Sequence, residues 1–173
     1  MKRLILMRHA KTEPWAEGVD DHARALTPSG HKAAAAMGAT LADEGWVPEK
    51  VLVSTARRTR ETWAHLSLVF PDAKPMIEDD LYLAGERGIS DLISDNDGVE
   101  TLMVLGHNPG LHDLGLTQIR EAGSKDHQAA MRLAAKLPTG AAALFEADEH
   151  GAYLPIHFKL VNFIRPKDVL PEG

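Results

Sequence analysis

The sequence has no cysteine, few aromatic residues and no long apolar run. The absence of cysteine excludes disulfides, thiol nucleophiles and thiolate metal sites. No stretch approaches the roughly 20 apolar residues that a membrane-spanning helix requires. The apolar run that follows Lys2 and Arg3 is also too short for a signal peptide. We therefore expect a cytoplasmic protein.

The overall composition is that of an ordinary globular protein. With 173 residues, 44% of them hydrophobic and 25% charged, the chain fits one domain over residues 1–173 and can bury a sizeable core. Its net charge of −6 argues against a general affinity for nucleic acid or for anionic membranes, so neither is an expected partner. An anionic ligand would have to be attracted by a local cluster of positive charge.

Short apolar runs alternate with helical patterns along most of the chain. Buried strands are predicted at residues 4–7, 51–53 and 101–105, with a weaker strand at 74–77. Helices are predicted at about 28–44, 55–70, 87–94, from 109 onward, and at 126–136. Strand-like stretches at 142–147 and 155–164, joined by a turn, predict a C-terminal antiparallel hairpin. This order favours a three-layer α/β/α sandwich with a mostly parallel central sheet.

Cationic and imidazole side chains follow three of the predicted strands. Arg8 and His9 end the first strand, a segment with three arginines follows the second, and His107 follows the fourth. The carboxyl ends of parallel strands meet at one edge of a sheet, where ligands bind in open α/β folds. Neutral imidazole is a nucleophile, and guanidinium groups are suited to phosphate oxygens. Helix N-termini at the same edge would add positive charge, so the pattern predicts a pocket for a phosphoryl group.

The sequence resembles the histidine phosphatase superfamily, and within it the small SixA-type phosphohistidine phosphatases. Four segments match motifs of that family, in the family's order and over nearly the whole chain: Leu6-Met7-Arg8-His9-Ala10 for R-H-G, Leu26-Thr27-Pro28-Ser29-Gly30 for L-T-x-x-G, Val53-Ser54-Thr55-Ala56-Arg57-Arg58 for V-S-x-x-x-R, and Gly106-His107-Asn108-Pro109 for the second histidine segment. The resemblance implies a fold like that of phosphoglycerate mutase.

The resemblance also implies roles for individual residues. His9 corresponds to the nucleophile that becomes phosphorylated, and Arg8, Arg58 and a cationic His107 correspond to the rest of the phosphate pocket. Thr12 falls where the family often has a hydroxyl near the phosphate. The arginines would replace a metal ion, so no cofactor is implied, and the histidines of this sequence show no metal-ligand spacing.

Two assignments remain open at this stage. Arg57 is the alternative to Arg58 as the phosphate ligand, because the assignment depends on register alone. Arg24 is expected either to contact the substrate or to form a salt bridge with Asp20 or Asp21.

Two departures from the mutase pattern bear on the substrate. Trp15 occupies a position where phosphoglycerate mutases have asparagine. The segment Leu81-Tyr82-Leu83-Ala84 lacks the glutamate that serves them as general acid, and Asp79, Asp80 and Glu86 cannot be aligned with it. An alkoxide leaving group, like hydroxide with a conjugate-acid pKa of about 15.7, needs such an acid. Imidazole, with a pKa near 6.5, does not.

This argument favours a phosphatase that removes phosphate from phosphohistidine on a protein, through a phosphorylated His9. The alternatives are a phosphomonoesterase that acts on a small phosphate ester and a phosphate-binding module without catalysis. A mutase is less well supported, because it needs the missing acid. Inorganic phosphate or sulfate is expected to bind in the same pocket.

Overall fold

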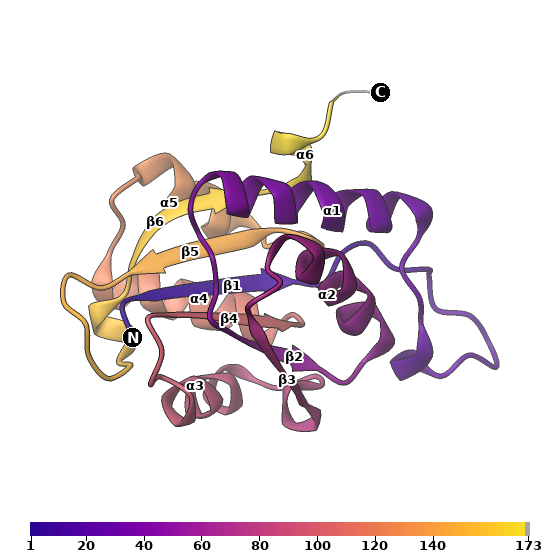
Figure 1. The fold of residues 1–173 in the computed structure, drawn as a ribbon, viewed down its shortest axis with the longest axis horizontal. Coiled ribbons are helices and arrows are strands. Elements are labelled where there is room, and N and C mark those ends of the chain that lie inside the picture. Colours follow the sequence, from indigo (N-terminus) through magenta and orange to yellow (C-terminus); the bar gives the residue numbers. More distant parts are fainter. Residues whose placement is uncertain (172–173) are drawn as a thin grey trace.

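The central element is a six-stranded mixed sheet, visible across the middle of Figure 1. It belongs to a computed structural model that describes residues 1–171. In spatial order the strands are β3 (Lys74–Glu78), β2 (Lys50–Ser54), β4 (Thr101–Gly106), β1 (Arg3–Arg8), β5 (Ala142–Glu146) and β6 (Lys159–Ile164). The first four of these are parallel to one another, and β5 runs antiparallel to both of its neighbours.

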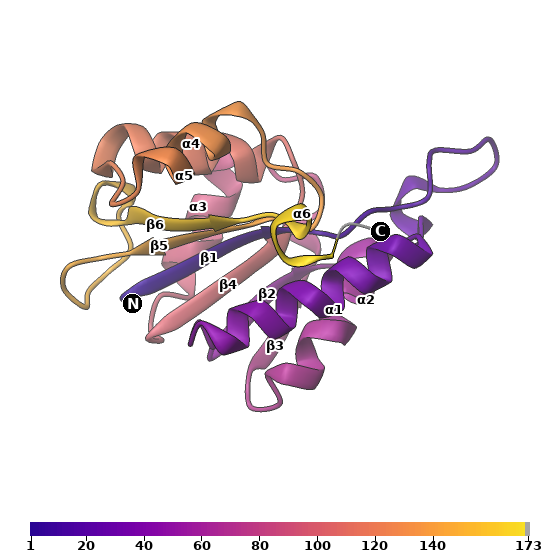
Figure 2. The same ribbon diagram turned by 90° about the horizontal axis from the view of Figure 1, so that it is seen from above.

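Helices cover both faces of the sheet (Figure 2). One layer holds α1 (Pro28–Asp43) and α2 (Arg57–Val69), and the other holds α3 (Glu86–Asp95), α4 (Gly110–Ala122) and α5 (His127–Ala135). A short helix, α6 (Pro166–Val169), contacts α1 near the end of the chain. The predicted three-layer sandwich is therefore confirmed, with a mostly parallel sheet. None of the described helices is long and apolar enough to cross a membrane.

Two apolar cores result from the alternation of side chains along each buried strand. In β1, Leu4 and Leu6 point into the core beneath α3, α4 and α5, whereas Ile5 and Met7 point into the core beneath α1 and α2. All four side chains are fully buried. The strand is thus held from both faces, so the polar residues at its carboxyl end have a fixed position.

The sequence predicts the cap of one helix correctly and that of another wrongly. The hydroxyl of Thr27 accepts a hydrogen bond from Gly30 N at 2.9 Å and caps α1, as its sequence predicts. The pair Asn108-Pro109 is typical of a helix cap and predicts one for α4, but Asn108 does not cap this helix. The helix begins only at Gly110, and Asn108 Nδ2 donates to the carbonyl of Leu137 at 2.9 Å. The amide therefore joins the loop that precedes β5 instead of closing the helix.

The C-terminal hairpin is also confirmed, with a shorter second strand than expected. The segment Pro155–His157 forms a single turn of 3-10 helix, and β6 begins only at Lys159. Proline has no N–H to donate to a strand ladder, which is consistent with this late start.

Candidate functional site

A pocket of about 360 Å³ lies at the carboxyl ends of the parallel strands. The pairing of Arg8 with Gly106 in the parallel β1–β4 ladder places His9 beside His107, with 5.3 Å between ring centroids. The pocket is lined by residues from six separate stretches of the chain: Arg8, His9, Thr12, Asp21, Arg24, Arg58, Leu83, His107, Asn108 and Thr139. The structure thus brings together all six residues that the sequence singled out.

His9 is buried and presents one defined ring nitrogen to the pocket. Its Nδ1 lies 2.8 Å from the carbonyl oxygen of Ala10. A carbonyl can only accept, so Nδ1 carries the hydrogen and Nε2 keeps its lone pair. Burial lowers the pKa of His9 to about 3, and the charges of His107 and Arg8 contribute in the same direction. At neutral pH the ring is therefore uncharged and nucleophilic.

In His107 the hydrogen-bonded ring nitrogen is Nε2, whereas in His9 it is Nδ1. Its Nε2 lies 2.7 Å from the hydroxyl oxygen of Ser54, while its buried Nδ1 has no hydrogen-bond partner among the described residues. Burial, followed by the charge of Arg58, lowers the pKa of His107 to about 4. The ring is therefore neutral at pH 7 in this structure, whereas the sequence analysis expected a cation.

Arg8 and Arg58 are two of the three arginines that line the pocket. Arg58 is almost completely buried and donates from Nη1 to the Asp21 carbonyl at 2.8 Å and from Nη2 to the Asp21 carboxylate at 3.2 Å. Arg8 donates from Nη1 to Leu137 O at 3.2 Å, and burial lowers its pKa. Arg57, the alternative to Arg58, is an exposed residue that pairs with Glu61 at 3.5 Å. Arg58 therefore lines the pocket, whereas Arg57 does not.

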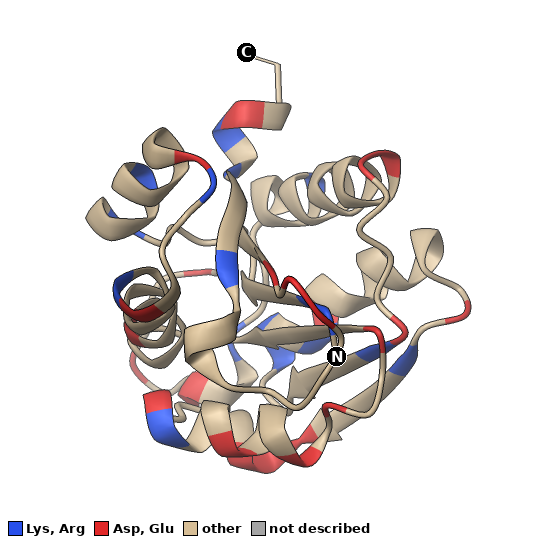
Figure 3. Ribbon diagram, turned by 90° about the vertical axis from the view of Figure 1, so that its left-hand side faces the viewer, with Lys and Arg blue, Asp and Glu red and all other residues tan. Residues whose placement is uncertain are grey.

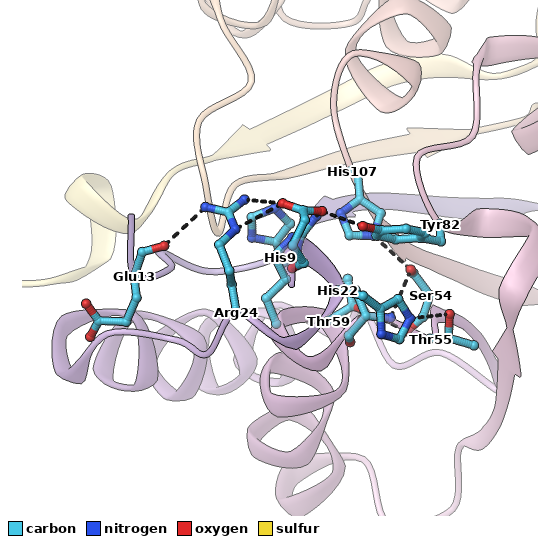
Figure 4. Close-up of polar contacts among 12 residues, drawn as sticks. His9, Glu13, His22, Arg24, Ser54, Thr55, Thr59, Tyr82 and His107 are labelled. Carbon is cyan, nitrogen blue, oxygen red and sulfur yellow. Dashed lines mark hydrogen bonds and ion pairs between the residues drawn. The ribbon is translucent and has the colours of Figure 1, made fainter. Parts of the chain in front are cut away.

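Asp21 joins several side chains at the rim of the pocket, among them Arg24 and Tyr82, which are labelled near His9 and His107 in Figure 4. Its carboxylate accepts hydrogen bonds from Tyr82 and Arg58, and Arg24 Nε donates to it at 3.0 Å. The hydrogen bond from Tyr82 is the largest cause of a lowered pKa of Asp21, and the two arginines act in the same direction. Arg24 therefore forms the expected salt bridge with Asp21, and because it also lines the pocket, its contact with a substrate stays a prediction.

The sequence patterns did not predict that Asp21 lines the pocket or that it forms a hydrogen bond with Tyr82. The expected pocket had no carboxylate, but Asp21 lines it. The remaining acidic candidates do not line the pocket: Asp79 accepts from Thr55 at 3.0 Å, and Glu86 accepts from Thr117. The run Asp20-Asp21-His22-Ala23-Arg24 was a visible signal of ion pairing, but it does not reveal that Arg58 lies within reach.

Metal binding has no evident basis within residues 1–171. No group of three or more His, Asp or Glu side chains there is placed to hold a metal ion. The positive charge at the pocket comes from guanidinium groups, which bind tetrahedral oxyanions through several parallel hydrogen bonds.

Comparison with known proteins gives consistent results. A family model for the histidine phosphatase superfamily (branch 1) matches residues 4–82. An uncharacterized protein of Mycobacterium tuberculosis is 34% identical over 163 residues, which cover 93% of this chain and 100% of the relative. Among solved structures, a candidate phosphohistidine phosphatase SixA from Agrobacterium tumefaciens is 27% identical, with a TM-score of 0.80 over 95% of this chain and 98% of that one.

A second solved structure agrees with the first. A candidate phosphohistidine phosphatase SixA from Nakamurella multipartitia is 29% identical, with a TM-score of 0.78 over 95% of this chain and 96% of that one. Both similarities extend over nearly the whole chain.

Proposed function

Since the chain belongs to the histidine phosphatase superfamily and is a phosphatase of the SixA type, we propose that its substrate is phosphohistidine on another protein. The observation that carries this proposal is that Asp21, the acidic residue at the pocket, is ionised. Asp21 is held ionised by Tyr82, Arg58 and Arg24, so it is a poor proton donor. A phosphatase without an efficient general acid works best on a leaving group that the enzyme does not have to protonate.

The first chemical step would be an in-line attack. The lone pair on Nε2 of His9 forms a bond to phosphorus while the bond from phosphorus to the substrate imidazole nitrogen breaks. Before the bond breaks, the distal ring nitrogen of the substrate takes a proton from solvent, as the imidazolium pKa near 6.5 allows, so the leaving group departs with the electron pair as neutral imidazole. Arg8 and Arg58 would hold the equatorial oxygens, so catalysis consists of positioning and charge stabilisation.

The second step would release phosphate. Water attacks the phosphorus of phospho-His9, the bond to Nε2 breaks, and the ring returns to its neutral form. A bound phosphoryl dianion would also favour protonation of His107, because its Nδ1 would then donate to a phosphate oxygen while Nε2 stays near Ser54. Guanidinium and imidazolium groups would supply all the positive charge, so we propose that the reaction needs no metal ion.

The decisive test compares a P–N bond with a P–O bond. We expect kcat/KM for a phosphohistidine peptide to exceed that for glycerol phosphate by about 10²-fold or more, the usual value of a general acid. Mass spectrometry under neutral conditions should show phosphate on His9 during turnover of the peptide. Comparable values of kcat/KM for the two substrates would contradict the proposal and favour a phosphomonoesterase.

A matched variant tests the assignment of Asp21. Asp21→Asn keeps the shape of the side chain but removes its charge. If Asp21 is no acid, the ratio of kcat/KM for the P–N substrate to kcat/KM for glycerol phosphate should be unchanged in this variant. A loss confined to glycerol phosphate would show instead that Asp21 protonates the leaving alkoxide, which would support the phosphomonoesterase.

A further inference from the structure

A second hollow, which we call the basic groove, lies beside the phosphate pocket. It has a volume of about 470 Å³ and runs between the end of α5, the loop 136–139 and α6. Half of its lining residues are basic, and none is acidic: Arg132, Ala135, Lys136, Pro138, Thr139, Arg165, Pro166 and Lys167. Such a concentration of positive charge is unusual in a chain with a net charge of −6.

Asp168 offsets part of the charge in the groove, because the hydrogen bond from Arg165 and also the charge of Arg132 lower the pKa of its carboxyl group. Arg165 pairs with Asp168 at 2.8 Å. Within residues 1–171, however, Arg132, Lys136 and Lys167 form no ion pair, and the Nε atom of Arg132 is buried without a hydrogen-bond partner. Both lysines are exposed. Figure 3 shows the charged residues of α6 below the C label, at one margin of the molecule. Many acidic residues lie elsewhere, on the side that faces the viewer.

The groove and the phosphate pocket share a wall. Thr139 lines both of them. The same loop is tied to the pocket from the inside, because Arg8 and Asn108 both donate to Leu137 O and Gly140 N donates to His9 O at 2.8 Å. A ligand in the groove would therefore lie at a fixed position relative to the nucleophilic nitrogen.

We propose that the basic groove binds an acidic segment of the phosphoprotein substrate, next to the phosphohistidine that enters the pocket. This inference rests on the proposed function and adds the means by which the enzyme selects its partner. A phosphoryl group alone is too small to fill both hollows, whereas a polypeptide that presents it continues past the rim. Carboxylates on that polypeptide would meet three cations that lack partners, and such charges at a rim accelerate association and give specificity.

The test uses two phosphohistidine peptides and one small substrate. The peptides differ only in their flanking residues, which are glutamate in one and serine in the other, and the small substrate is phosphoramidate. For the wild-type protein at low salt we expect kcat/KM to be about tenfold higher for the acidic peptide. The double variant Lys136→Glu/Lys167→Glu should lose this preference through KM, and it should hydrolyse phosphoramidate at the wild-type rate.

The matched control reverses the charge of two lysines at the amino ends of strands. Lys2→Glu/Lys74→Glu changes the net charge by the same amount but lies away from the groove, so it should keep the preference. Salt at about 0.5 M should abolish the preference in the wild-type protein by screening.

Several outcomes would overturn the inference. One is equal kcat/KM for the two peptides in the wild-type protein, with phosphoramidate turned over normally. Another is an equal loss of preference in the control variant, which would indicate an effect of net charge. Binding to phosphatidylglycerol vesicles that depends on Lys136 and Lys167, without a peptide preference, would assign the groove to a lipid surface. Failure to hydrolyse any P–N substrate would instead contradict the proposed function itself.

Discussion

The two histidines of the pocket occupy equivalent places in the fold but have different neighbours. Each follows a buried parallel strand, β1 for His9 and β4 for His107, and burial lowers the pKa of both. The partner of His9 is a backbone carbonyl, whereas the partner of His107 is the hydroxyl of Ser54. The difference shows how a single hydrogen bond can determine which nitrogen a ring offers to a ligand.

A carbonyl and a hydroxyl restrict a ring in different ways. The Ala10 carbonyl can only accept, so it keeps His9 in one tautomer with a free lone pair on Nε2. The Ser54 hydroxyl can donate or accept, so His107 can be neutral with hydrogen on Nδ1, or protonated. A fixed tautomer suits a nucleophile, and an adjustable ring suits a group that responds to the charge of a bound phosphoryl group.

The largest expected effect comes from removing each ring in turn. His9→Ala should lower kcat by about 10⁴-fold or more, because no other group can form the covalent intermediate. His107→Ala should lower kcat by about 10² to 10³-fold, the usual cost of one donor to a developing charge. Rapid-quench experiments followed by neutral-pH mass spectrometry should find phosphoprotein in His107→Ala and none in His9→Ala. Phosphate bound covalently to His9→Ala would show that the two roles are reversed.

A smaller effect is expected from the hydroxyl that distinguishes the two sites. Ser54→Ala should lower kcat/KM by about fivefold, which corresponds to the loss of one hydrogen bond of about 1 kcal/mol. The informative readout is the ¹⁵N chemical shifts of the His107 ring, which report the tautomer. A serine with only a packing role would leave these shifts unchanged, so an unaltered spectrum would contradict the proposed control of His107.

A third effect concerns the stability of the fold at acid pH. The folded state holds the pKa of His107 at about 4, below its ordinary value of about 6.5, so the unfolded chain binds a proton that the folded chain does not. Neutral His107 makes its full contribution to the free energy of unfolding above about pH 6.5. This contribution is lost as the pH falls toward 4. The loss should amount to about 3 kcal/mol.

Urea unfolding at a series of pH values would measure this loss. His107→Gln cannot bind the proton, so its free energy of unfolding should fall less steeply between about pH 6.5 and 4 than that of the wild-type protein. Because all other groups are common to both proteins, the difference between the two curves isolates His107. Parallel curves would contradict the lowered pKa.

Much of the pocket could be predicted from short sequence patterns. Arg8, His9 and His107 each follow an apolar run of the right length for a buried strand, and the parallel pairing of β1 with β4 brings those ends together. Arg58 required a choice of register, which the structure decides by burying its side chain and leaving Arg57 exposed. Helix periodicity alone could not make this distinction at the first turn of α2.

Other contacts depend on residues far apart in the chain and left no local signal. Asp21 meets Arg58 and Tyr82 across 37 and 61 positions. Asn108 matched the pattern of a helix cap, yet its amide bonds to Leu137. In both cases a side chain that could satisfy itself locally found a partner on another loop, and only the packing of those loops makes that partner available.

The sequence by itself determined where the reactive groups lie, because the hydrophobic pattern decides which segments become buried strands, and the polar residues after them must emerge at one edge. The tertiary structure alone decided how those groups act. The nitrogen that each histidine exposes, the ionised state of Asp21 and the basic groove between α5 and α6 all depend on hydrogen bonds and charges contributed by distant loops. The strength of such contacts depends on ångström-scale distances and on burial, which exist only once the chain has folded.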